Sequence, residues 1–121
     1  MVGEFGAYVA SKRIEKDVKL RTIAEKLKLS VTYLSDIIKG RRLPPDIEGL
    51  KLMAEALDLN DEEKDQLFDL AGRERNQVSP DMNDYIMDED LPSARVALRR
   101  ARNKNLGEDF WREVNKMIDD K

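Results

Sequence analysis

The chain has 121 residues, a formal net charge of −3, 40% hydrophobic residues, and neither cysteine nor histidine. This length and apolar content fit one globular domain, or a small domain with an appendage. Without those two residue types, disulfides, thiolate nucleophiles, zinc fingers and imidazole bases are excluded, so we expect no enzyme, no metal and no cofactor. No apolar run approaches the roughly 20 residues of a membrane span and no signal pattern opens the sequence, which predicts a cytoplasmic protein without a membrane partner.

The charges are unevenly distributed along the chain. Residues 1–60 hold 11 basic and 9 acidic residues, whereas residues 61–121 hold 11 and 16. Within residues 11–42 the balance is 10 basic against 4 acidic, or +6. This window is a candidate phosphate-binding surface, although a solvated charged face would have the same composition.

Apolar residues recur at helical spacing, and no alternating run is long enough for a strand, which predicts an all-α fold. Five helices are expected in the first part of the chain. They cover residues 4–16 and 20–27, a third from the N-cap Ser30 to near Gly40, a fourth over 46–57, and a fifth that ends at Gly72. Asn60 and Glu63 have the spacing of a capping box at the start of the fifth.

A polar stretch from residue 73 to residue 83 marks the predicted domain boundary. We expect one domain over residues 1–72 and a helical extension over residues 73–121. Ser79-Pro80 is expected to start a short helix and Pro92 a longer one. A last helix is expected to hold Phe110, Trp111, Val114, Met117 and Ile118.

The segment from Leu20 to Ile37 contains two short helices joined by a few residues, which must pack closely at a steep angle. Ala24 supplies the small side chain that this contact needs. The run LRTIAEKLKLSVTYLSDIIKGRRLPP resembles the helix-turn-helix of the Cro/C1-type repressors, the XRE family, including the Ser that opens the second helix and the Gly-basic-basic-x-Pro after it. The resemblance covers residues 3 to about 71 and implies a five-helix, lambda-repressor-like DNA-binding domain.

Three positions depart from the family pattern. Lys28 stands in the turn where many members have Gly, which implies local strain if its φ is positive. Lys19 and Leu20 replace the polar N-cap and Gln that often begin the second helix. Ile38 stands where an acid often pairs with an Arg of the first helix, so Arg13 is expected to be free for another partner such as phosphate.

The resemblance implies that the third helix enters the major groove of double-stranded DNA and acts in transcription regulation. The side chains expected to read bases are Val31, Thr32 and Asp36. The groups expected to contact the DNA backbone are Arg13, Lys19, Arg21, Ser30, Tyr33, Ser35, Lys39, Arg41 and Arg42.

The extension carries too many apolar residues for a solvated linker, so we expect a partner or the first domain to cover them. The candidates for a dimer or partner contact are Tyr85, Ile86, Leu98, Phe110, Trp111, Val114, Met117 and Ile118. A homodimer is favoured, because short operators are usually read by two helix-turn-helix units. Packing against the first domain or against a different protein stays open.

Two further functions use the same features. An antitoxin-type regulator would bind DNA through the helix-turn-helix and a protein through the extension, and an adaptor would bind protein without DNA. Catalysis is the least supported class, because acidic pairs such as Asp88 and Asp90 lie in polar segments that leave them ordinary carboxylates. The favoured function is a repressor that reads an inverted-repeat operator as a dimer.

Overall fold

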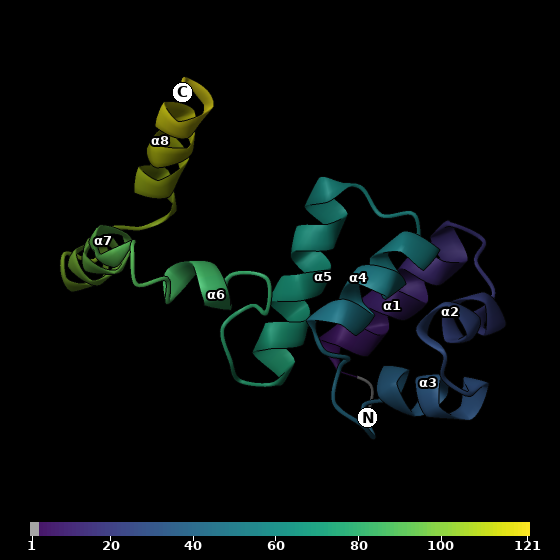
Figure 1. Cartoon of the computed structure of the whole chain (residues 1–121). Coiled ribbons are helices and arrows are strands. Elements are labelled where there is room, and N and C mark those ends of the chain that lie inside the picture. Colours follow the sequence, from purple (N-terminus) through teal and green to yellow (C-terminus); the bar gives the residue numbers. More distant parts are fainter. Residues whose placement is uncertain (1–2) are drawn as a thin grey trace. The chain divides into compact units, whose positions relative to one another are not determined.

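The computed structural model describes residues 3–121, so the first two residues of the predicted first domain lie outside the described part. The described residues form helices and no strand, which confirms the all-α expectation. The helices are α1 (Glu4–Glu15), α2 (Leu20–Leu27), α3 (Val31–Ile38), α4 (Ile47–Ala56), α5 (Asp61–Glu74), α6 (Asn83–Ile86), α7 (Pro92–Asn103) and α8 (Glu108–Asp119) (Figure 1).

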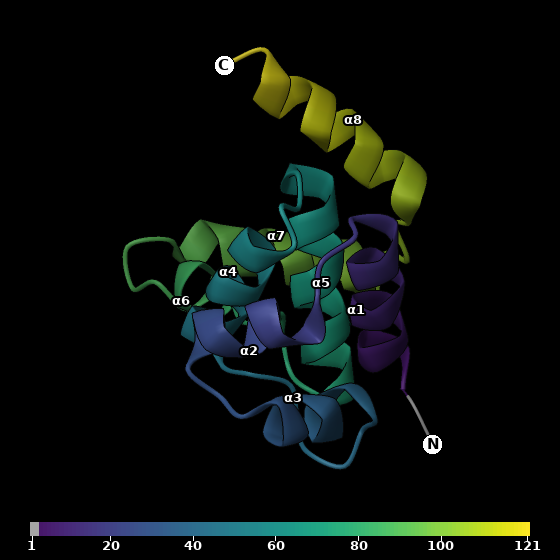
Figure 2. The same cartoon turned by 90° about the vertical axis from the view of Figure 1, so that its right-hand side faces the viewer.

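The chain divides into two compact units, the first reaching Asn83 and the second running over Asp84–Lys121. In the first unit, α1 packs against α5 and α3, while α2 packs against α3 and α4. Figure 2 shows α3 at one edge of this unit, beside α2. The apolar faces of these helices meet in a single core. Its buried members are Phe5, Val9, Ile23, Ala24, Leu34, Ile37, Leu50, Met53, Ala54, Leu57, Leu59, Leu67, Phe68, Leu70 and Ala71.

Most helices end through the same turn, in which one residue takes the left-handed conformation. After α2, Lys28 has φ 59°, and the N–H of Leu29 donates to the carbonyl of Ala24. This bond satisfies a carbonyl at the helix end that would otherwise lack a partner. The residues with positive φ are Asp17, Lys28, Gly40, Asp58, Asn76 and Asn105. The turns at Lys28 and Asp58 join consecutive helices that pack against each other, α2 with α3 and α4 with α5.

Side-chain caps begin three of the helices in the first unit. Ser30 and Asp46 each accept a hydrogen bond from the backbone N–H three residues later. Asn60 and Glu63 form the predicted capping box, with the Asn60 side chain accepting from the N–H of Glu63 and the N–H of Asn60 donating to the Glu63 carboxylate. The expected helix starts at these positions are confirmed to within one residue.

The expected end of α5 at Gly72 is wrong, because the helix continues to Glu74. Gly72 is a packing position. A Cβ there would lie 2.9 Å from the backbone nitrogen and Cα of Ser79, where the chain returns across the helix. The left-handed residue that follows α5 is Asn76. The first unit includes the polar stretch that follows Gly72 and ends at Asn83.

The second unit contains α7, α8 and most of α6. The expected short helix begins at Asn83 rather than at Ser79-Pro80, while Pro92 opens α7 as expected. The guanidinium of Arg95 donates to the carbonyls of Ile86 and Asp88, both at 2.7 Å, and so joins α7 to the segment before it. Ala101 is buried, and the larger apolar side chains of this unit remain partly or largely exposed.

Candidate nucleic-acid interface

The contact between α2 and α3 depends on small and apolar side chains. Ala24 is buried on α2, and Leu34 and Ile37 are buried on α3. The left-handed Lys28 reverses the chain between the two helices, with ψ 40° as well as positive φ. Lys28 therefore adopts the backbone conformation that glycine favours at this position. A lysine is strained in that conformation because it has a Cβ.

The N-terminal turn of α3 leaves its outer side chains in solvent. Val31 is 41% exposed, and Thr32 is exposed beside it. The hydroxyl of Ser30 accepts from the N–H of Tyr33 at 3.0 Å, so this serine caps the helix. The first turn carries no acidic residue. The first amides of a helix have no partner within it and can donate to a phosphate. Because no acidic side chain stands in this turn, a phosphate can approach it without charge repulsion.

Two predicted DNA contacts pair with each other. Arg41 Nη1 lies 3.5 Å from Asp36 Oδ1, and the side chains are 70% and 27% exposed, respectively. The N–H of Arg41 also donates to the carbonyl of Asp36, through the turn at Gly40. An exposed ion pair of this kind contributes only about 0–1 kcal/mol. Arg41 can therefore exchange the carboxylate for a phosphate at small cost.

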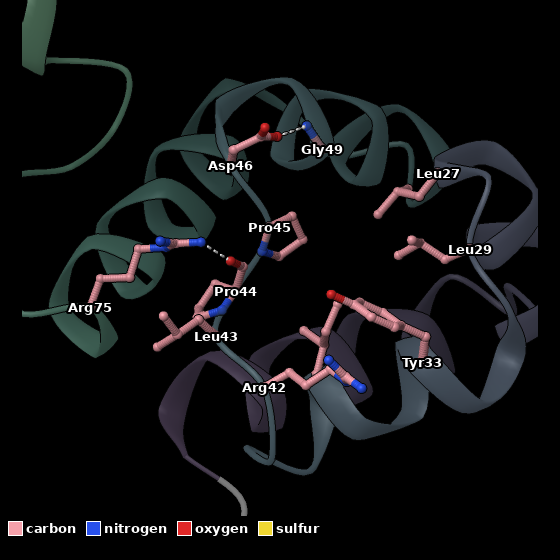
Figure 3. Close-up of a pocket in the computed structure, with 11 residues that line it drawn as sticks. Leu27, Leu29, Tyr33, Arg42, Leu43, Pro44, Pro45, Asp46, Gly49 and Arg75 are labelled. Atoms are coloured by element: carbon pink, nitrogen blue, oxygen red, sulfur yellow. Dashed lines mark hydrogen bonds between the residues drawn. The ribbon is translucent and has the colours of Figure 1, made fainter.

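Tyr33 and Arg42 form a second contact beside α3. The guanidinium of Arg42 lies 4.2 Å from the centroid of the Tyr33 ring, a cation–π distance. Figure 3 shows both side chains at a pocket of about 590 Å³ between α3 and the segment before α4. Leu27, Leu29 and Pro45 line its apolar wall. The stacking holds Arg42 close to the outer face of α3.

Arg75, which no pattern in the sequence marks as functional, fixes the segment that carries Arg41 and Arg42. Its guanidinium donates to the carbonyl of Pro44 (Figure 3). Pro44 is itself fully buried, so the segment is anchored at this residue. Arg75 could not be found from the sequence, because it lies beyond Gly72, the predicted end of the first domain.

Arg13, expected to be free for a partner other than an acid, bonds a backbone carbonyl in the structure. It is half-buried, and its Nη1 donates to the carbonyl of Val18 at 3.4 Å, within the turn between α1 and α2. The predicted contact with phosphate would have to use the other N–H groups of its guanidinium. Lys19, Arg21 and Lys39 are exposed, whereas Ser35 is half-buried.

An ion cluster joins α1 to the start of α5. Lys12 and Lys16 lie 2.8 and 3.1 Å from the Glu63 carboxylate. The N–H of Asn60, followed by the two lysines, lowers the pKa of Glu63 to about 2. Hydrogen bonds to Glu63 and Glu15 raise the pKa of Lys12. These two lysines are thus structural cations, and they are separate from the predicted phosphate contacts.

The candidate partner residues of the second unit lie mainly in solvent. Ile86, Trp111 and Val114 are half-buried. Met117 and Ile118 are 62% and 61% exposed on the last turns of α8. The other exposed members are Tyr85, Leu98 and Phe110.

Within residues 3–121, no helix has both the length and the apolar character to span a bilayer. Over the same range, no three acidic side chains gather in a way that could hold a metal ion.

Comparison with known proteins gave one result that bears on this geometry. The helix-turn-helix family model matches residues 9–64, which include α2, α3, the turn at Lys28 and α4. Neither the curated proteins nor the solved structures gave a match. The matched segment is the one whose outer surface combines the exposed turn of α3 with the basic residues around it.

Proposed function

We propose that this chain, whose residues 9–64 match the helix-turn-helix family model, is a DNA-binding transcriptional regulator of the Cro/C1 type. It acts as a repressor that reads an inverted-repeat operator as a dimer. The observation that carries the proposal is the exposed, acid-free first turn of α3, set beside basic side chains on either side. A helix presented in this way enters the major groove with its N-terminal residues toward the bases.

Within this proposal, Val31 contacts a thymine methyl group and Thr32 hydrogen-bonds a base edge. Asp36 accepts from a cytosine amino group when Arg41 moves from it to a phosphate. The backbone is held by the basic side chains beside α2 and α3, together with the amides at the helix starts. These contacts are Arg13, Lys19, Arg21, Ser30, Tyr33, Ser35, Lys39, Arg41 and Arg42.

Self-association through the second unit, which makes up most of the predicted helical extension, brings a second copy of α3 to the DNA. The support is the apolar stripe of α8, on which Phe110, Met117 and Ile118 are exposed. Burying apolar side chains stabilises an interface by about 25 cal/mol per Å². Two α3 helices would then lie about 34 Å apart, one turn of DNA, with two-fold symmetry that matches an inverted repeat.

Selection of bound sequences from a random duplex pool tests the function as a whole. The proposal expects one enriched motif, present twice in inverted orientation with centres about 10 base pairs apart. Enrichment of no sequence would contradict it. A single asymmetric motif would contradict the dimer and leave DNA reading in place.

Thr32→Ala tests the recognition residue. We expect it to weaken the selected site by about 1–3 kcal/mol and to relax preference at one base position. Thr22→Ala, on the exposed face of α2, is the matched change outside the proposed readout. If the Val31, Thr32 double substitution leaves the sequence motif unchanged, the assignment is wrong.

Arg41→Ala together with Arg42→Ala tests the backbone contacts. Each lost phosphate contact should reduce the slope of log affinity against log salt by about 0.9, equally on all sequences. Altered base preference with an unchanged slope would contradict the assignment.

Ile118→Glu tests the dimer. A charge on the apolar face of α8 should convert a dimeric chain to a monomer in sedimentation. Lys116→Gln makes the same change of net charge on the opposite, polar face and should leave the chain dimeric. A wild-type chain that sediments as a monomer would refute self-association.

A further inference from the structure

Basic residues are concentrated on one helix of the second unit. The sequence of α7, PSARVALRRARN, contains four arginines and no acidic residue, in a chain whose net charge is −3. Lys104 follows directly. The acidic residues of this unit lie before α7 and on or after α8, so the acidic balance of the extension as a whole conceals a basic helix.

Three of the four arginines have no ionic partner in the structure. Arg95 is used internally, by the carbonyls of Ile86 and Asp88. Arg99, Arg100 and Arg102 are exposed, and no carboxylate within residues 3–121 lies within ion-pair distance of them. On α8, by contrast, Arg112 lies 3.4 Å from Asp109.

This arrangement has an energetic cost in the free protein. Residues three apart on a helix are neighbours, so Arg99 and Arg102 repel each other, and like charges at such spacing destabilise a helix by a few tenths of a kcal/mol. An anion that binds between them removes that repulsion. Guanidinium groups match phosphate oxygens with two parallel hydrogen bonds, which favours phosphate as the anion.

The surface around these arginines favours a nucleic acid over an acidic protein. Protein interfaces are centred on buried aromatic or large aliphatic anchors. The arginine face of α7 includes Val96 and Asn103 but no aromatic side chain. Of the aromatic residues of this unit, Phe110 of α8 lines a small pocket together with Arg100 and Ala101. Arg99 and Arg102 do not line that pocket, so their part of the surface has no aromatic anchor.

We propose that Arg99, Arg100 and Arg102 of α7 form a second phosphate-binding surface, which contacts the DNA backbone outside the bases read by α3. The inference rests on the proposed function, since it requires a chain that binds DNA. Because both units belong to one chain, binding of the first raises the effective concentration of phosphate around the second. The contact adds affinity without sequence preference, as phosphate contacts do.

The test compares full-length variants on the duplex selected by the wild-type chain, with flanking sequence on both sides. Arg99→Gln, Arg100→Gln and Arg102→Gln together should reduce the salt slope by about 2.7, at about 0.9 for each lost contact. The selected motif should not change. Glutamine has a helix propensity close to that of arginine, so the helical circular dichroism should be retained.

Two further variants control for charge and for folding. The triple change to lysine keeps three cations on α7 and should keep most of the salt slope. Gln substitution of Arg112, Lys116 and Lys121 removes the same charge from the rest of the unit and should change the slope much less. An equal reduction in this control would overturn the inference, because the effect would then come from net charge alone.

An unchanged slope in the α7 triple variant would also overturn the inference and would direct attention to an acidic protein as the partner of these arginines. That outcome leaves the proposed function intact, since the wild-type chain still binds its motif. If the wild-type chain binds no duplex, the proposed function and this inference fail together. The two failures are therefore distinguishable in one set of titrations.

Discussion

The two units of the chain bury very different amounts of apolar side chain. The first brings fifteen buried hydrophobic residues into one core, whereas the second buries only Ala101. Yet α7 and α8 each have 12 residues and regular apolar stripes. Isolated helices of about 12–15 residues are marginal in water, because most of their stability comes from tertiary packing. The first unit thus has a core that positions α3, whereas the second unit has little buried apolar surface to stabilise it by itself.

The largest expected effect of a single substitution follows from this difference. Leu34 is fully buried where α3 meets the core, and Leu34→Ala should lower the free energy of unfolding by about 2–5 kcal/mol. Leu98→Ala, at an exposed leucine of α7, should change it far less in dilute, monomeric protein. Urea denaturation of both variants measures the two values. Equal losses would show that the second unit has a core of comparable importance.

A smaller effect is expected at the start of α5. Asn60→Ala removes the side chain that accepts from the N–H of Glu63, and loss of such a cap costs about 0.5–2 kcal/mol. Replacing Asn60 by Ser keeps a capping oxygen and should restore most of the stability. Thermal melts of the two variants provide the measurement, and an Ala variant as stable as wild type would contradict the role of the capping box.

The Glu63 cluster predicts how the first unit responds to acid. The pKa of Glu63 is about 2 in the folded chain, against an ordinary value of 4.5, so its contribution to stability is complete above pH 4.5. That contribution is lost as the pH falls from 4.5 through about 2. The unfolding midpoint of Glu63→Gln should therefore depend less on pH over this interval than that of the wild type. Parallel slopes for the two proteins would contradict the cluster.

The smallest expected change concerns the turn of the helix-turn-helix. Lys28→Gly should be neutral or slightly stabilising, because glycine adopts φ near 59° without strain and this offsets its extra freedom in the unfolded chain. Lys26→Gly, inside α2, should instead cost about 0.5–1 kcal/mol. A clear loss of melting temperature at Lys28 would mean that its backbone is not left-handed in solution.

Local signals in the sequence were sufficient to predict most helix starts of the first unit. Ser30 and the pair of Asn60 and Glu63 act through bonds to residues three positions away, so their spacing alone predicts them. The contact of Arg75 with Pro44 could not be predicted, because it joins residues 31 positions apart and requires α5 to continue past Gly72. The sequence does not distinguish a glycine that ends a helix from one, such as Gly72, that leaves room for a neighbouring backbone.

In the candidate interface, too, local features could be predicted from the sequence and features that depend on the folded chain could not. The exposure of Thr32 follows from helical periodicity, which the sequence displays. The pairing of Asp36 with Arg41 depends instead on the left-handed turn at Gly40, which returns the chain to the end of α3. The basic face of α7 was not predicted, because the net charge of the whole extension does not show that its arginines are grouped on one helix.

The central claim is that the first unit meets DNA through α3, and mapping the contact surface by nuclear magnetic resonance tests it most directly. The full chain is titrated with its selected duplex while backbone amide shifts are followed. The account predicts the largest changes from Ser30 to Asp36, with further changes near Lys19 and near Arg41. Changes confined to α4 and α5, with the amides of α3 unmoved at saturation, would contradict it.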